Sequence, residues 1–467
     1  MRMQEVDLNR EKNITFRFRS TDKVIKYNEL KDSYLYFCPY SEEDDVLEGM
    51  SNLYWQADEI LWKNFYAHYL LVLFFNHTRL LFASDDDEKE NIVHEGITWR
   101  LFRTDFRIEN MISSFLEHDV TNIVLEATMS KNHKVHRDEL KFYFHLLHLV
   151  ALQTIKKNCF PDNADFVKKD NLLDLPKDSL KNFLDAVKWD DMNKDSVFRV
   201  FDKKLRCYLG EILSSNEKRP SWETWIIHDF PDIYFQLLNK VAFPDWYLTS
   251  FCKNCTNARN WAQYGDSHKG ICLIFRTHDS RSGKGIRLNI CHKYDSRDGY
   301  VYEKHIEPLK EISYLTTAQE LNFFSYLGNI PGGILKEWCT MPDGTISQYY
   351  VSRNSREKWD MWHRNYWETF QNIALQKGSS WIGLAEERII LTDDLIVDYH
   401  KKENRKIHYD FSELQGIIWG CRTDDAQKKI IRDIITNLCK EHNRSGFEFY
   451  QAVEEPGTLD IWIEKDI

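Results

Sequence analysis

Glycine is distributed unevenly along this chain, and its distribution constrains the fold more than any other sequence feature. The 467 residues contain 18 glycines, whereas an average usage of about 7% would give roughly 33. Only Gly49, Gly96 and Gly210 precede residue 265. Glycine serves turns and positive-φ positions, so a long stretch without it suits helices joined by short polar loops. The glycine-richer remainder suits strands and hairpins.

Local periodicity agrees with this division. Residues 14–19 alternate apolar and polar side chains, and residues 34–38 are mostly aromatic, which predicts two N-terminal strands. Apolar residues recur at helical spacing over residues 53–82, without glycine or proline. We expect further helices at residues 137–158, 177–189, 195–214 and 222–241, the last with Pro231 as a kink or break.

Strand patterns return after residue 243. We expect strands at residues 246–251, 271–276, 286–291, 311–314, 387–391 and 416–419, and helices at 353–376 and 424–440. A lone N-terminal hairpin is marginal in water, so its partner strands should come from this later part of the chain.

The predicted fold class is therefore α+β, with a mixed sheet built from the N- and C-terminal parts of the chain and a large helical insertion. Residues 1–84 are predicted to form the N-terminal part of this α+β core. Residues 85–242 are the predicted helical insertion, and residues 243–467 are the C-terminal part of the core.

Composition excludes several classes of protein. Aromatic residues supply 14% of the chain, which excludes a disordered chain. The longest purely apolar run, residues 69–75, is far shorter than the about 20 residues of a membrane-spanning helix. The first ten residues are polar and the cysteines are scattered, so we expect no signal peptide, free thiols and a cytoplasmic location. A net charge of −11 argues against non-specific coating of nucleic acid.

Arg17 and Arg19 share one face of the first predicted strand, because side chains alternate along a strand. Two adjacent guanidinium groups repel each other unless an anion is near. They could grip a phosphate or carboxylate of a ligand, since arginine offers a planar fork of donors. They could equally pair with carboxylates of the protein itself, such as Glu386 or Asp44.

Aromatic and charged residues later in the chain offer a second candidate site. Trp261 and Tyr264 share a face of one helical turn and could stack a base or nicotinamide, or belong to the core. Glu386 and Arg388, which follow Lys377, are two residues apart on one predicted strand and point to the same face, so they could pair with each other or serve a ligand. A buried carboxylate beside cations can also stabilise a developing positive charge.

Two other patterns bear on nucleic acid and metal. Residues 276–297 are rich in arginine and lysine, and could meet nucleic acid or form a solvated hairpin. Cys252 and Cys255 form a lone CxxC, whereas a structural zinc site needs a second ligand pair. His145 and His148 lie on an apolar helix and are interpreted as core residues. We therefore expect no metal.

Four stretches, taken in order, resemble family 2971 of the bacterial domains of unknown function. The first is the strand Phe16-Arg17-Phe18-Arg19, with arginine where the family has lysine at Arg17. The second is the aromatic strand at residues 34–37, followed by Asp44-Asp45-Val46-Leu47-Glu48, with Asp for Asn and Val for Pro. The third comprises Trp261, Tyr264, Gly270 and the strand at residues 271–275. The fourth comprises Lys377, Trp381, Leu384, Glu386 and Arg388, in which Leu384 replaces the first glutamate of the family's pair.

The resemblance implies a bacterial stress- or phage-defence effector, toxin-like and connected with abortive infection. The motif order is also similar to that of ADP-ribosyltransferases, which place Arg or His on the first strand, an aromatic or hydroxyl residue on a middle strand and Glu late. This similarity implies catalytic roles for Arg19, Tyr264 and Glu386, with NAD as the substrate. It implies a ligand-binding set made of Arg17, Trp261, Lys377, Arg388 and Glu48.

Two alternatives stay open from the sequence. One is a nuclease effector that acts on RNA or DNA through residues 276–297. The other is a non-enzymatic module that binds a ligand or a partner protein, such as an antitoxin, through the helical residues 85–242. No membrane partner is expected. If the transferase hypothesis holds, Arg19, Tyr264 or Trp261, and Glu386 should line one concave surface.

Overall fold

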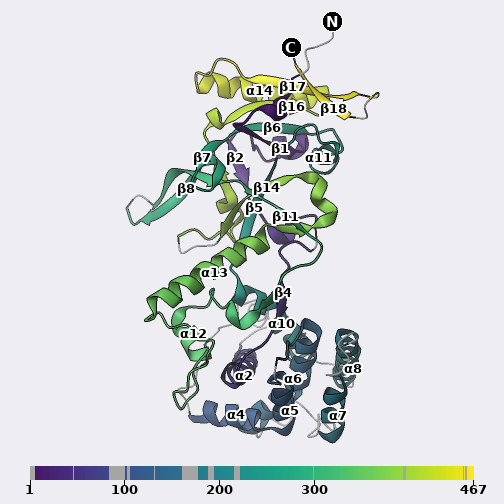
Figure 1. The fold of residues 1–467 in the computed structure, drawn as a ribbon, viewed down its shortest axis with the longest axis vertical. Helices are drawn as coiled ribbons and strands as arrows, with labels where there is room; N and C mark the ends of the chain where they lie inside the picture. Colours follow the sequence, from purple (N-terminus) through teal and green to yellow (C-terminus); the bar gives the residue numbers. More distant parts are fainter. Residues whose placement is uncertain are drawn as a thin grey trace. The chain divides into compact units, whose positions relative to one another are not determined.

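The structure is a computed structural model of the chain (Figure 1). It describes residues 6–45, 47–83, 100–101, 106–130, 132–159, 177–187, 194–214, 221–297, 299–392, 396–455, 457 and 460–466. The chain divides into two compact units. The sheet unit comprises Met1–Met50, Asp245–Ala318 and Glu368–Ile467, and the helical unit comprises Ser51–Pro244 and Gln319–Trp367.

A mixed sheet forms the centre of the sheet unit. Its strands are β1 (Ile14–Arg19), β3 (Cys38–Pro39), β5 (Trp246–Cys252), β6 (Ile271–Arg276), β10 (Lys310–Glu311), β14 (Glu386–Thr392), β16 (Leu414–Trp419), β17 (Glu448–Glu455) and β18 (Asp460–Lys465). The order is β10-β14-β5-β1-β6-β16-β17-β18, with β3 paired to β5. Only the β16–β17 pair is parallel among the described strands of this sheet. Strands from both ends of the chain meet here, which confirms the predicted α+β fold class.

Smaller elements surround this sheet. The helices are α1 (Thr21–Lys26), α11 (Ala258–Gln263) and α14 (Asp425–Glu441), with the short 3-10 turns η1 (Leu8–Arg10), η2 (Tyr40–Glu42), η5 (Ser379–Leu384), η6 (Lys402–Arg405) and η7 (Phe411–Glu413). The additional strands are β2 (Tyr34–Tyr36) with β15 (Lys406–His408), β7 (His278–Ser280) with β8 (Gly283–Asp295) and β9 (Gly299–Pro308), and β11 (Ser313–Leu315) with β13 (Gln376–Gly378).

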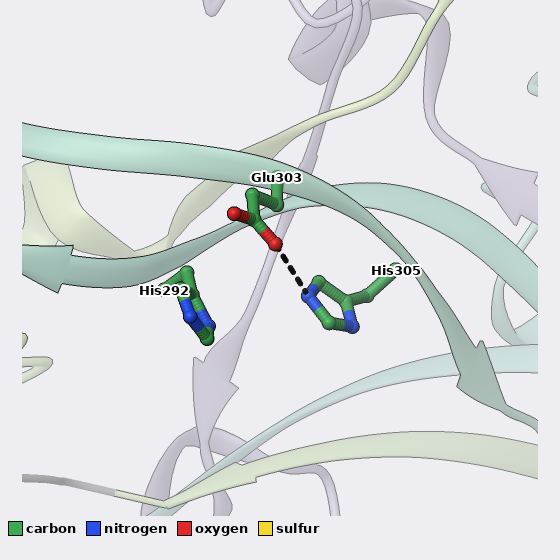
Figure 2. A group of neighbouring side chains, drawn as sticks. All are labelled: His292, Glu303 and His305. Carbon is green, nitrogen blue, oxygen red and sulfur yellow. Dashed lines mark ion pairs between the residues drawn. The ribbon is translucent and has the colours of Figure 1, made fainter.

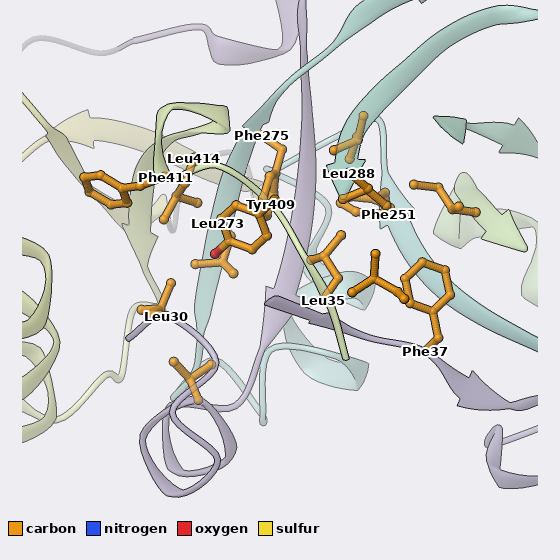
Figure 3. Packing of buried hydrophobic residues seen from close by; sticks show 14 of the residues in the cluster. Leu30, Leu35, Phe37, Phe251, Leu273, Phe275, Leu288, Tyr409, Phe411 and Leu414 are labelled. Carbon is orange, nitrogen blue, oxygen red and sulfur yellow. The ribbon is translucent and has the colours of Figure 1, made fainter. Parts of the chain in front are cut away.

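The hydrophobic core of the sheet unit consists of two clusters, one on each face of the sheet. Side chains of β1 point alternately to the two faces. Phe16 and Phe18 point into a cluster that contains Trp261, which we call the Trp261 cluster. The other face carries a larger cluster around Phe275 and Tyr409, which we call the Phe275 cluster (Figure 3). Apolar residues of α14 belong to the Phe275 cluster, so this helix covers that face of the sheet.

The helical unit is built from helices around α2. They are α2 (Glu59–Phe82), α4 (Phe106–Leu116), α5 (Asp119–Thr128), α6 (Arg137–Cys159), α7 (Lys177–Val187), α8 (Lys194–Ser214), α9 (Ser221–Thr224), the π-helical turn η3 (Trp225–Asp229), α10 (Phe230–Ala242) and α12 (Gly332–Trp338). Two short strands pair in parallel, β4 (Asn52–Tyr54) with β12 (Glu320–Asn322), and η4 (Phe323–Ser325) follows β12. Helix α13 (Arg356–Ala374) runs across the boundary between the two units.

The burial of α2 explains why this helix belongs to the helical unit rather than to the sheet unit. Helix α2 is buried on nearly all its sides from Leu61 to Leu73, so it needs other helices around it and belongs to the helical unit. The predicted division between residues 84 and 85 lies outside the described residues. Residues 51–83, assigned from the sequence to the α+β core, cluster with the helical unit, as do residues 319–367.

Pro231 does not break the helix that contains it. It lies in the first turn of α10, directly after the π-helical turn η3. The N–H of Phe230 bonds to the carbonyl of Trp225, five residues back. Because proline has no N–H to donate, the wider turn accommodates it where the hydrogen-bond ladder changes register. None of the described helices combines the length and the apolar character that spanning a lipid bilayer requires.

Candidate functional site: a buried ion-pair network

Four charged side chains of the sheet unit form a buried network at the start of β14. Glu386 begins this strand, and Arg388 lies two residues further on, so both point to the same face. Lys377 comes from β13, and Glu48 comes from the turn that precedes Gly49. Each of the four side chains is at most 2% exposed.

Each cation of the network contacts both carboxylates. Arg388 Nε lies 2.7 Å from Glu386 Oε1, and Arg388 Nη1 contacts Glu48 Oε1. Lys377 Nζ lies 3.1 Å from Glu386 Oε2 and 3.3 Å from Glu48 Oε2. The charges therefore alternate in sign around a closed ring and sum to zero, which is a condition for burying charges at all.

Hydroxyl groups add further contacts around Glu386. Ser250 Oγ, on β5, donates a hydrogen bond of 2.5 Å to Glu386 Oε1. The Tyr264 hydroxyl lies 3.5 Å from both Glu386 Oε2 and Lys377 Nζ. The backbone N–H of Glu386 donates to the Tyr314 hydroxyl at 3.0 Å. Glu386 is therefore the centre of the network.

The environment separates the pKa values of the two glutamates. Burial opposes ionisation of Glu386, but the charges of Arg388 and Lys377 and two hydrogen bonds outweigh it and lower the pKa to about 2. Burial raises the pKa of Glu48, and the same two cations only partly offset it. Burial alone would lower the pKa of Lys377, but the two carboxylates outweigh it and raise that pKa. Glu386 is thus held as a carboxylate at neutral pH.

Strained backbone flanks the network. Ala385, next to Glu386, has a φ of 47°, and Asp266, Ser267 and His268, which follow Tyr264 closely, have φ values of 52°, 54° and 68°. Residues other than glycine rarely adopt this region. Such conformations persist only where the surrounding structure imposes them, and they concentrate at functional sites.

The structure brings together five of the residues predicted from the sequence. Glu48, Tyr264, Lys377, Glu386 and Arg388 come from segments far apart in the chain and meet in this network. Of the two alternatives for Glu386 and Arg388, the pairing with each other is observed. Ser250 was not singled out from the sequence, because nothing distinguishes it from any other polar residue of a strand.

Arg17 and Arg19 do not join the network. Phe16 pairs with Cys252, and Cys252 pairs with Glu386, so Glu386 shares the face of Phe16 while both arginines point to the opposite face. The shared surface expected for Arg19 and Glu386 is therefore not formed.

Each of these arginines contacts the protein's own groups. Arg19 pairs with Glu29, with Nε 2.9 Å from Oε2, rather than with Glu386 or Asp44. Arg17 donates to the Thr249 hydroxyl and to the Ser250 carbonyl. Burial, followed by the charge of Arg19, lowers the pKa of Arg17 to about 10.

Trp261 belongs to the core rather than to a ligand wall. Its side chain is fully buried, meets the Phe18 ring edge-to-face at 4.9 Å, and donates from Nε1 to the Cys255 carbonyl at 2.8 Å. The ring next to the network is Trp381, which is half-buried and lies with its centre 5.1 Å from Lys377 Nζ. The sequence placed Trp381 in the fourth motif but gave it no contact role.

The basic stretch at residues 276–297 is partly neutralised by the protein itself. Lys284 pairs with Asp279 at 2.7 Å, and Arg287 lies 3.4 Å from Glu413. Cys252 and Cys255 are both buried free thiols. His145 and His148 are buried in the helical unit.

Comparisons of the chain with protein-family models, with curated proteins and with solved structures found no match. The resemblance to family 2971 thus stays a prediction that rests on its four motifs. Three of those motifs contribute side chains to the network, namely Glu48, Tyr264, and the group of Lys377, Glu386 and Arg388.

Proposed function

We propose that this chain is a bacterial stress- or phage-defence effector with toxin-like action, and that it consumes NAD or transfers ADP-ribose at Glu386. The observation that supports this is the buried network itself. Burying charges costs several kcal/mol per ion, and apolar residues of similar volume often stabilise a core as well or better. Buried titratable groups with strongly shifted pKa values are typical of functional sites.

The proposed chemistry uses the ionised carboxylate of Glu386. Cleavage of NAD breaks the bond between the ribose carbon and the nicotinamide nitrogen, and the bonding electrons leave with nicotinamide. Positive charge develops on the ribose carbon and ring oxygen, and a fixed carboxylate stabilises it. Water or an acceptor hydroxyl then bonds to the ribose carbon and loses its proton. A Glu386 pKa of about 2 keeps the carboxylate charged throughout.

Neighbouring residues take revised roles in this proposal. Trp381, rather than the buried Trp261, would stack on the nicotinamide or adenine ring. Burial, together with the charge of Glu386, raises the pKa of Tyr264, so its hydroxyl keeps its proton and can donate a hydrogen bond. Arg19 is left out of the catalytic set because it pairs with Glu29 on the opposite face of the sheet.

Substrate access requires a change in the structure. The Glu386 side chain has no exposed surface, so the described state is proposed to be closed. The segment that carries Glu48 is the proposed cover, because Leu47 and Met50 on either side of it are 65% and 49% exposed. An activating signal would displace this segment and open one side of the network.

The test combines a growth assay with product analysis. The wild type, expressed in a bacterial host that supplies the activating signal, should arrest growth and deplete NAD, and extracts of those cells should release nicotinamide, measured by liquid chromatography. Glu386→Gln should abolish all three effects. Glu413→Gln is the matched control, because Glu413 is a buried, ion-paired glutamate of the same unit, bonded to His278 at 2.6 Å, and it should behave as wild type. Growth arrest at an unchanged NAD level would contradict the proposal.

A second candidate function is a non-enzymatic module that binds a partner protein. It is favoured by exposed apolar side chains on the segments that carry the network, namely Leu47, Met50 and Ile382, the last 64% exposed. Exposed apolar residues of this kind mark interaction surfaces when they gather. The helical residues 85–242 would offer a partner a separate surface of their own. This candidate predicts that Leu47→Asp removes the cellular effect while the wild type releases no nicotinamide.

A further inference from the structure

Three side chains that commonly ligate metals lie together on the β8–β9 hairpin. Figure 2 shows His292 from β8 beside Glu303 and His305 from β9. One ligand atom from each residue lies within 4.8 Å of the other two. His305 Nε2 is 3.8 Å from Glu303 Oε2, and the imidazole rings of His292 and His305 stack with centroids 6.3 Å apart.

Strand geometry explains why these residues meet. Glu303 and His305 are two residues apart on β9, so they share a face of the hairpin. The pairing of β8 with β9 shifts register between Cys291 and Lys293, and His292 is the residue left between them. Ile290 pairs with Glu303 and His292 is two residues further on, so alternation places His292 on the face that Glu303 and His305 occupy, while the bulge leaves it without a directly paired residue on β9.

The donor set indicates the class of ion. Imidazole suits Zn²⁺ and neighbouring transition metals, whereas Mg²⁺ and Ca²⁺ prefer oxygen ligands alone. Two histidines and one glutamate are also a ligand set of zinc sites that keep an open fourth position. Zinc bonds of roughly 2.1 Å would place tetrahedral ligand atoms about 3.4 Å apart. The three side chains are exposed, so modest side-chain rotations would bring their atoms to that spacing.

The surroundings leave room for a fourth ligand. A hollow of about 610 Å³ borders His305 and is lined also by Arg281, Ile306 and Pro308. An ion held by the hairpin could therefore take water or an anionic group from solvent in its remaining position. Because ligating imidazole is deprotonated, the ion would also hold the two stacked rings in their neutral form.

We propose that His292, Glu303 and His305 bind a divalent transition-metal ion of the Zn²⁺ class, with one coordination position open. The site is separate from the Glu386 network and does not depend on the proposed function. Its ligands come from two neighbouring strands, so the ion would clamp the hairpin and stabilise the folded state, in which alone the site exists.

The test is a Co²⁺ titration of the full chain followed by visible absorption. We expect saturable binding of one ion, ligand-field bands of a four- or five-coordinate site, no cobalt–thiolate charge-transfer band, and displacement by Zn²⁺. His292→Ala and His305→Ala should each weaken binding at least tenfold. His442→Ala, which removes an exposed histidine elsewhere in the same unit, should leave binding unchanged.

A second measurement guards against variants that fold poorly. Zn²⁺ should raise the Tm of the wild type and of His442→Ala, but not the Tm of His292→Ala or His305→Ala. Equal Co²⁺ affinity in the wild type and in the His292→Ala/His305→Ala double variant would overturn the proposal. So would the absence of saturable binding, or binding that carries the thiolate band and therefore belongs to cysteines.

Discussion

At Glu386, burial raises the pKa of the carboxyl group and the neighbouring positive charges lower it, and the effect of the charges is the larger. The carboxylate contacts Arg388, Lys377 and the Ser250 hydroxyl, which together favour its ionised form more than burial disfavours it. Glu48 contacts the same two cations, yet burial dominates there. The two carboxylates are therefore not equivalent, and Glu386 is the one whose pKa is lowered, so that it stays ionised at neutral pH.

Acid should weaken the sheet unit in a window set by Glu386. Its pKa falls from the ordinary 4.5 to about 2 in the fold, so its stabilising contribution is present above pH 4.5 and is lost as pH falls from 4.5 to 2. A shift of this size corresponds to roughly 3 kcal/mol, and the raised pKa of Glu48 acts in the opposite sense and reduces the net effect. The net loss of stability is measured as the difference in the free energy of unfolding by urea between pH 7 and pH 3.

The matched variant for this prediction is Glu386→Gln, which cannot ionise at that position. The wild type should lose more free energy of unfolding between pH 7 and pH 3 than Glu386→Gln does. An equal loss in both proteins would show that another group sets the acid sensitivity.

Ala385→Gly should stabilise the protein. Ala385 has a φ of 47°, a region that costs a residue with a side chain about 1–2 kcal/mol and glycine little. We expect an increase in the free energy of unfolding of about 1 kcal/mol, read from the denaturant midpoint. Ala426→Gly in the first turn of α14 is the control and should destabilise. A loss of stability in Ala385→Gly would mean that the left-handed conformation carries no strain.

At the scale of elements, the approach of β6 to β1 depends on Gly270. A Cβ on this residue would lie 2.3 Å from the Arg19 carbonyl oxygen and 2.9 Å from the Gly265 carbonyl oxygen. Both obstacles are backbone atoms, so the strands would have to shift. Gly270→Ala should therefore destabilise by about 1–3 kcal/mol, the usual range for overpacking, measured by thermal or urea unfolding.

Gly210→Ala is the matched control for this substitution. Gly210 lies within α8 and a Cβ there meets nothing within 4 Å. Alanine is preferred to glycine in a helix by about 1 kcal/mol, so this change should stabilise. A change in the free energy of unfolding with the same sign for both substitutions would contradict the steric account of Gly270.

The sequence predicted some elements that place apolar side chains in a core and missed others, since α4, β17 and β18 were not predicted although each has a buried apolar face. β1 and β6 form at the predicted residues because their apolar side chains enter a core. β9 was missed because half of its residues are exposed and none is buried, so it carries no apolar alternation. Of the candidate site, the sequence identified Glu386 and its charged partners but missed Ser250, and it could not place Arg19, because strand register decides which face each residue occupies.

At the scale of the whole molecule, the two units should respond to acid in different windows. Burial lowers the pKa of His77 to about 4 and that of His148 to about 3, so the fold of the helical unit favours their neutral forms. This contribution is present above the ordinary histidine pKa of 6.5 and is lost as pH falls below it. The Glu386 contribution to the sheet unit is lost only below pH 4.5.

Hydrogen exchange at pH 7 and pH 5 resolves this difference. Corrected for intrinsic exchange rates, protection should fall in α2 and α6 at pH 5 while β1 and β6 keep theirs. An equal loss of protection in both units would contradict it, as would a loss confined to the sheet unit.

The central claim is that the buried network serves chemistry rather than stability alone. The most direct measurement is the rate of nicotinamide release per folded molecule, for the wild type and Glu386→Gln in the same bacterial extract, with the folded fraction determined by circular dichroism. We predict release by the wild type and a rate at least about 100-fold lower in Glu386→Gln, as removal of a transition-state stabilising group produces. Equal rates for the two folded proteins, or no release by a wild type that arrests growth, would contradict the account.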